Sequence, residues 1–151
     1  MKRIINIKTS KEHYKGAPCL VWCFDDRFHN LLEKFRDFLK KDSGIERVDI
    51  IEVAGGAKGL ANPDGEYKRQ TLLGEIGASV KLHYPPFVGL MVHEDCGAYG
   101  KKFPSEKEEL VFYQSELKKA KETVENFLKE SGDNIPVKIY YADFEGLIEL
   151  S

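Results

Sequence analysis

The run Cys19-Leu20-Val21-Trp22-Cys23, which follows Pro18, is the stretch that decides the fold. A continuous apolar run of this length is typical of a strand that is covered on both faces, as in a parallel sheet. Three further strand patterns occur at residues 48–54, 87–92 and 137–142. The sequence therefore predicts about four strands, most of them buried on both faces.

Three segments between these strands have the apolar spacing of amphipathic helices. They begin near residue 28, near residue 66 and after the capping-box pattern Ser105-x-x-Glu108. Alternating strands and helices predict an α/β fold in three layers, with a mostly parallel central sheet in the order 2-1-3-4 and helices on both faces. We expect a single domain over residues 1–151.

The composition excludes several classes of function. The 151 residues include 23 Lys and Arg and 25 Asp and Glu, a net charge of −2, so we expect no nucleic-acid partner. No run reaches the roughly 20 apolar residues of a membrane span, and the basic start lacks the apolar stretch of a signal peptide. Three cysteines are too few for a disulfide scaffold, which favours the reducing cytoplasm.

Side chains that can bind a metal follow two of the predicted strands. Cys23 ends the first strand, and His93-x-x-Cys96 follows the third. The carboxyl ends of parallel strands meet at one edge of a sheet, where ligands bind. If the first and third strands are neighbours, Cys23, His93 and Cys96 converge. Two thiolates and one imidazole leave a tetrahedral zinc ion with one open position, the arrangement of a catalytic zinc site.

The same residues have simpler interpretations. A lone His-x-x-Cys pattern is weak evidence, because a buried cysteine is ordinarily a small core residue. We assign Cys19 to the core, since an extended strand puts it about 13 Å from Cys23, too far for a disulfide or a shared metal. His83 would serve as a proton shuttle only if it faced the mouth of the site. The Gly55-Gly56-x-x-Gly59 segment lacks the ending of a P-loop, and we expect a tight loop beside a ligand.

Two motifs, taken together, resemble the signature of the β-class carbonic anhydrases. That family pairs Cys-x-Asp-x-Arg after its first strand with His-x-x-Cys-Gly after its third, and this chain has the two patterns at residues 23–27 and 93–97. Residues 53–56 are similar to the family's Arg-Asn-Ala-Gly loop, and residues 140–147 to its final strand and hairpin. Asp26 stands where the family has serine, and the N-terminal arm is shorter.

The resemblance implies one zinc ion per chain, held by Cys23, His93 and Cys96. It implies the reversible hydration of carbon dioxide to bicarbonate by a metal-bound hydroxide, a carbonate dehydratase reaction. It also implies a homodimer or a higher homo-oligomer.

The resemblance also implies roles for residues around the metal. Asp25 would orient the attacking hydroxide, and Arg27 would pair with Asp25 and hold it off the metal. Gly55 and Gly97 would border the substrate. The alternative for Asp25 is a helix N-cap, and the alternative for Arg27 is a surface cation.

Other functions stay open on the same residues. One is the hydrolysis of carbonyl sulfide or carbon disulfide at the same kind of site. Another is a non-catalytic zinc-bearing binding or regulatory module in which Asp25 closes the fourth position. A third is an unrelated small-molecule-binding α/β domain that uses the glycine loop and no metal.

Overall fold

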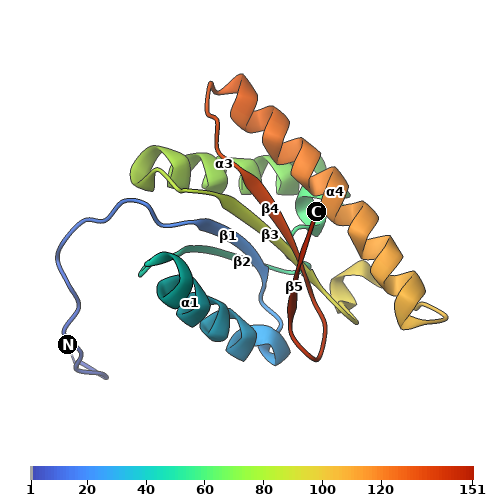
Figure 1. Cartoon of the computed structure of the whole chain (residues 1–151), viewed down its shortest axis with the longest axis horizontal. Helices are drawn as coiled ribbons and strands as arrows, with labels where there is room; N and C mark the ends of the chain where they lie inside the picture. The colour runs from blue at the N-terminus through green and yellow to red at the C-terminus, as the bar shows by residue number, and fades with distance from the viewer. Residues whose placement is uncertain (1) are drawn as a thin grey trace.

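The computed structural model of the protein describes residues 2–151, and its strands form a five-stranded sheet in the order β2-β1-β3-β4-β5 (Figure 1). β1 to β4 run parallel, and β5 pairs antiparallel with β4. The predicted order 2-1-3-4 is therefore confirmed, and a hairpin adds a fifth strand at the edge. The strands are β1 (Cys19–Cys23), β2 (Asp49–Val53), β3 (Val88–His93), β4 (Val137–Ala142) and β5 (Leu147–Leu150).

The helices lie on both faces of the sheet, with α1 on one side and α3 and α4 on the other (Figure 1). This confirms the predicted three-layer α/β fold. Within the described residues, no helix is both long and apolar enough to span a membrane. The helices are α1 (His29–Ser43), α2 (Lys58–Ala61), α3 (Glu66–His83) and α4 (Glu106–Glu130), with 3₁₀ turns η1 (Asp26–Phe28) and η2 (Gly97–Tyr99).

Helix α1 covers its face of the sheet through aromatic side chains. Phe35 lies 6.2 Å from the Trp22 ring of β1 and 5.1 Å from the Tyr140 ring of β4, measured between ring centroids. The helix ends at Gly44, whose φ of 66° is the left-handed conformation typical of a helix C-terminus. The packing holds α1 against the central strands, and the 3₁₀ turn η1 joins β1 to α1 after two intervening residues.

Helix α4 begins at the predicted cap. The Ser105 hydroxyl accepts a hydrogen bond from the backbone N–H of Glu108 at 3.3 Å. Leu117, Ala120 and Val124 on its inward face are fully buried. The buried inward face packs α4 against β3 and β4, and the first turn of α4 lies close to the carboxyl end of β3.

The N-terminal segment is tied to the opposite end of the sheet. The Tyr14 hydroxyl donates to the carboxylate of Asp49 at 2.9 Å, and the Tyr14 ring stacks on His83 at 4.1 Å. His83 Nδ1 lies 2.7 Å from the same carboxylate. Asp49 begins β2, so His83 lies at the amino end of the strands and does not face the edge that carries Cys23 and His93.

The loop between β2 and α2 crosses close over the neighbouring strands. Gly56 has a φ of 54°, and a Cβ atom at this position would overlap the backbone carbonyl of Met91 in β3. The N–H of Ala57 donates to that same carbonyl at 2.9 Å. Glycine is required here both by the left-handed backbone and by the close approach.

Gly56→Ala should destabilise the protein. The left-handed backbone alone costs about 1–2 kcal/mol for a residue with a Cβ, and the overlap with Met91 adds to it. Gly74, which lies in α3 with open space around it, provides the matched control. Gly74→Ala should stabilise the helix by about 0.5–1 kcal/mol. Urea unfolding midpoints measure both changes, and a Gly56→Ala protein as stable as its parent would contradict this account of the loop.

Candidate metal centre

The three predicted ligands converge at the carboxyl edge of the sheet. Cys23 is the last residue of β1, His93 is the last residue of β3, and Cys96 lies in the turn that leads to η2. Their ligand atoms all lie within 4.8 Å of one another, and all three residues are buried. The pairing of β1 with β3 brings together residues that are 70 positions apart in the sequence (93 − 23).

The side chains of this group have the chemistry of a metal site. The Nδ1 atom of His93 lies 2.7 Å from the backbone carbonyl of Glu94, which fixes the N–H on Nδ1 and leaves the Nε2 lone pair free. Nε2 is buried and has no hydrogen-bond partner in the described structure. A buried imidazole nitrogen without a partner costs free energy, and the sulfurs of Cys23 and Cys96 lie within 4.8 Å of the ligand nitrogen of His93. Two thiolates and one such nitrogen fit zinc.

The two thiols of the group influence each other. Contact with Cys96 and with His93 lowers the pKa of Cys23 to about 4, against the opposing effect of burial. The same contact with Cys23 raises the pKa of Cys96. The backbone N–H of Gly55 donates to the Cys23 sulfur at 3.3 Å, which further favours its thiolate form. Cys19 is different: burial raises its pKa to about 12, and it is fully buried in the core as predicted.

Asp25 lies beside the ligands and is both a cap and an ion-pair partner. Its carboxylate accepts the backbone N–H of Arg27 at 3.1 Å, which caps η1. It also accepts hydrogen bonds from Nε and Nη2 of the Arg27 guanidinium at 3.0 and 2.7 Å. These hydrogen bonds lower the pKa of Asp25 to about 2. One Asp25 oxygen lies 3.8 Å from His93 Nε2, so the carboxylate adjoins the space between the three ligands.

Asp95 is a residue of this cluster to which the sequence analysis assigned no role. Its carboxylate accepts a hydrogen bond from Nη1 of Arg27 at 2.9 Å, and its backbone carbonyl accepts one from Nη2 at 3.0 Å. Asp95 stands inside the His93-x-x-Cys96 motif, and this position between two predicted ligands was the available signal. The guanidinium of Arg27 is therefore held from two sides, by Asp25 and by Asp95.

Aromatic side chains pack beside the three candidate ligands. The Phe28 ring lies 4.3 Å from the imidazole of His93, and the Phe144 ring lies 5.5 Å from Phe28. The Arg27 guanidinium lies 5.6 Å from the Phe144 ring. Phe24 and Phe144 are exposed large apolar side chains. The exposed ring of Phe144 thus places apolar surface beside Phe28, which packs on the His93 imidazole.

The two glycines predicted to border a substrate take different positions. Gly55, with a φ of 80°, uses its N–H to bond the Cys23 sulfur. Gly97 opens η2 directly after Cys96 and is exposed. Asp26 is also exposed, in η1. His29 is exposed at the first turn of α1 and lies outside the metal-ligand group.

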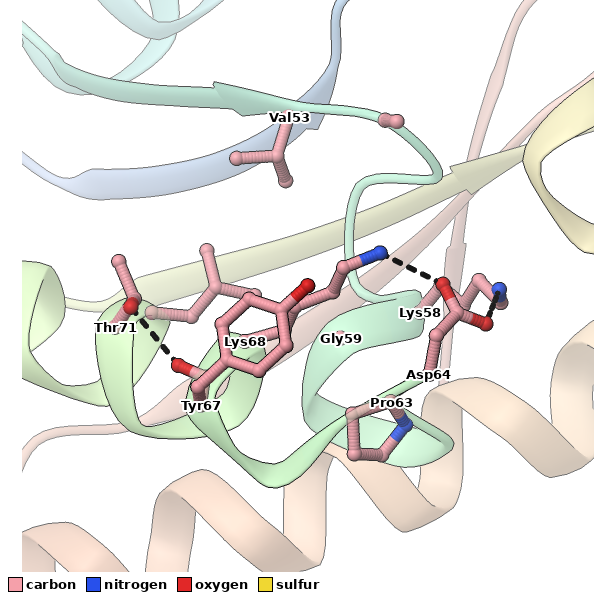
Figure 2. A pocket seen from close by; sticks show the side chains of 10 residues that line it. Val53, Lys58, Gly59, Pro63, Asp64, Tyr67, Lys68 and Thr71 are labelled. Atoms are coloured by element: carbon pink, nitrogen blue, oxygen red, sulfur yellow. Dashed lines mark hydrogen bonds and ion pairs between the residues drawn. The ribbon is translucent and has the colours of Figure 1, made fainter.

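A separate pocket of about 240 Å³ lies on the far side of the glycine loop, between the end of β2 and α3. Figure 2 shows Lys58 and Lys68 joined to the carboxylate of Asp64, with the Tyr67 ring beside them. Its lining includes Val53 but none of the three metal-ligand candidates. The pocket therefore adjoins the loop that supports Cys23 without containing the candidate centre.

The fold and the group at its carboxyl edge define an α/β protein with a candidate centre of two cysteines and one histidine. A family model described as "Putative carbonic anhydrase" matches residues 14–149. The chain therefore belongs to this carbonic anhydrase-like family.

The individual proteins that match this chain are only distantly similar to it in sequence. An uncharacterized protein from Rickettsia bellii (strain RML369-C) is 26% identical over 158 residues, covering 98% of this chain and 92% of that protein. The crystal structure of a carbonic anhydrase from Streptococcus mutans is 16% identical, covers 95% of this chain and 88% of its own, and has a TM-score of 0.49. One of two tetrameric β-carbonic anhydrases from Sordaria macrospora is 13% identical, covers 91% and 82%, and has a TM-score of 0.49. The family assignment rests on the family model.

Proposed function

We propose that this chain is a zinc-dependent lyase that hydrates carbon dioxide reversibly to bicarbonate. The single observation that carries the proposal is the buried, unpartnered Nε2 of His93 beside two thiols, with the carboxylate of Asp25 at 3.8 Å. Membership of the carbonic anhydrase-like family supports the reaction class.

Cys23, His93 and Cys96 would hold the zinc ion and leave its fourth position to a small molecule. Zinc bound there would supply Lewis acidity that brings the pKa of water close to neutrality. The N–H of Gly55 offsets part of the negative charge on the Cys23 sulfur, so less of that charge is passed to the metal.

Asp25 and Arg27 would prepare the attacking water. The Asp25 carboxylate, held by the Arg27 fork, accepts a hydrogen bond from the water and points its lone pair at the carbon of the substrate. The Phe28 and Phe144 rings offer carbon dioxide an apolar approach. Gly55 and Gly97 border the substrate in this proposal. Carbonyl sulfide and carbon disulfide have the same linear shape and are the substrates of the variant reaction at the same kind of centre.

A second function follows from the position of Asp25. Its oxygen lies close enough to His93 Nε2, at 3.8 Å, to become a fourth ligand if Arg27 released it. The protein would then be a non-catalytic zinc-bearing module for binding or regulation. A stopped-flow assay of carbon dioxide hydration by the zinc-loaded parent separates the two, since only an open centre gives a rate above the uncatalysed one.

The metal can be tested without an assay of activity. The purified protein should contain about one zinc ion per chain, and Cys23→Ser and Cys96→Ser should each lose most of it, because serine oxygen is a poorer zinc ligand than thiolate. Cys19→Ala removes the third buried cysteine and should keep its zinc. Mass spectrometry of the elements measures the content. Zinc should also raise the unfolding midpoint of the parent, because it binds the native state. Full zinc content in both serine variants would overturn the ligand assignment.

Arg27→Ala should keep zinc but lower kcat/KM for carbon dioxide hydration about 10- to 100-fold, the usual effect of removing a residue that orients a metal centre. Without the guanidinium, the Asp25 carboxylate turns towards the metal. Arg36→Ala is the matched control, because Arg36 is an exposed α1 residue that pairs with Glu33. Unchanged activity in Arg27→Ala would mean that Arg27 is a surface cation.

We propose that copies of the chain associate as a homodimer or a higher homo-oligomer. Ile4, Ile5 and Ile7 in the N-terminal segment are among the most exposed apolar side chains, and their burial against a second copy would remove that surface from water. Light scattering at micromolar concentration should give at least a dimer mass. Replacing all three isoleucines by serine should shift it towards the monomer, and a monomeric parent would contradict the proposal.

A further inference from the structure

The turn between His93 and Cys96 is held by a residue of a distant helix. Asp95 has a φ of 50°, the left-handed conformation that a residue with a Cβ adopts at a cost. Its backbone N–H donates to the carboxylate of Glu109 at 2.7 Å. Glu109 lies in the first turn of α4 and is 9% exposed. The hydrogen bond to a buried carboxylate compensates for the strained backbone at Asp95.

This turn also sets the direction of the Asp95 side chain. In its left-handed conformation the residue presents both its carboxylate and its carbonyl oxygen to Arg27, at 2.9 and 3.0 Å. The remaining donors of the guanidinium engage Asp25. A rigid planar fork held at both ends has little freedom to turn. The hydrogen bonds thus form one chain from α4 to the candidate centre: Glu109, Asp95, Arg27 and Asp25.

We propose that Glu109 is a positioning residue of the metal centre, which keeps Arg27 turned towards Asp25 through the backbone of Asp95. The inference rests on the proposed function and names the residue that keeps the fourth metal position open. Without the Glu109 acceptor the turn relaxes and Asp95 leaves Arg27. Arg27 then no longer holds Asp25, and the carboxylate closes the centre.

The charges around Arg27 explain why its position affects the metal centre. Two carboxylates, from Asp25 and Asp95, hold the Arg27 guanidinium, and a third, from Glu109, accepts the backbone N–H of Asp95. A dication bound between the ligands would attract the nearest of them, Asp25. Arg27 can compete for that carboxylate only while it is held in place, because an exposed ion pair by itself contributes little.

The test uses the cobalt-loaded full chain and azide, a small anion that binds an open metal position and changes the visible spectrum of cobalt. Glu109→Met keeps the side-chain length and removes the acceptor. It should need about 10- to 100-fold more azide for half-saturation than the parent. Glu109→Gln keeps an acceptor oxygen and should restore azide binding close to that of the parent. Glu108→Ala, an exposed neighbour in the same turn, is the matched control and should behave as the parent does.

Asp95→Gly provides a second variant that does not depend on the folding of Glu109→Met. Glycine accepts a φ of 50° without strain, so the turn and its bond to Glu109 remain while the carboxylate that holds Arg27 is lost. Cobalt content should stay at about one per chain, and azide binding should weaken as in Glu109→Met. If Glu109→Met binds azide as tightly as the parent, the inference is wrong, and normal azide binding in Asp95→Gly would likewise break the proposed link between Asp95 and Arg27.

The same experiment separates the inference from the proposed function. Azide binding reports whether the fourth metal position is open, and it does not depend on the reaction with carbon dioxide. A parent that binds azide but does not hydrate carbon dioxide therefore removes the proposed reaction, while the ratio between Glu109→Met and its parent still decides the role of Glu109. A parent that binds no cobalt overturns both.

Discussion

The parallel pairing of β1 with β3 is the constraint on which the candidate centre depends. Cys19 pairs with Val88 and Leu20 with Gly89, so the two strands run in register and end at the same edge. Gly89 leaves room for the Leu20 side chain across this pairing, because a Cβ there would come within 2.7 Å of it. Both strands are fully buried, and such a buried pair resists any slip of register. The positions of Cys23 and His93 are thus determined by the core of the protein.

The negative charge of the candidate ligands has to be compensated, because they lie at a buried edge of the sheet. Thiolates removed from water are costly unless a positive charge or a hydrogen bond compensates for them. The N–H of Gly55 bonds one sulfur, and Arg27 neutralises the adjoining carboxylate of Asp25. The remaining negative charge suits a divalent cation. The left-handed backbone at Gly55 directs its N–H to the Cys23 sulfur. The left-handed backbone at Asp95 directs its carboxylate and carbonyl oxygens to Arg27.

Much of the fold and the core of the site could be predicted from the sequence, because both depend on local patterns. The apolar run at β1 and the capping pattern at Ser105 each specify an element by themselves. The metal candidates lie directly after strands, where parallel topology brings them together.

The supporting residues could not be predicted in the same way. The bond between Glu109 and Asp95 joins positions 14 residues apart through a backbone N–H, and it depends on a left-handed residue that no periodicity indicates. The location of His83 depends on its contact with Asp49, from another element. The short strand β5 is only partly buried, so its pattern is weak.

The central claim is that two cysteine sulfurs and one histidine nitrogen bind a single zinc ion. X-ray absorption at the zinc edge of the purified protein tests it most directly, because it counts the atoms bound to the metal by type and distance. The account predicts two sulfur atoms at about 2.3 Å and nitrogen or oxygen atoms at about 2.0–2.1 Å. A first shell of nitrogen and oxygen alone, or with one sulfur, would contradict it.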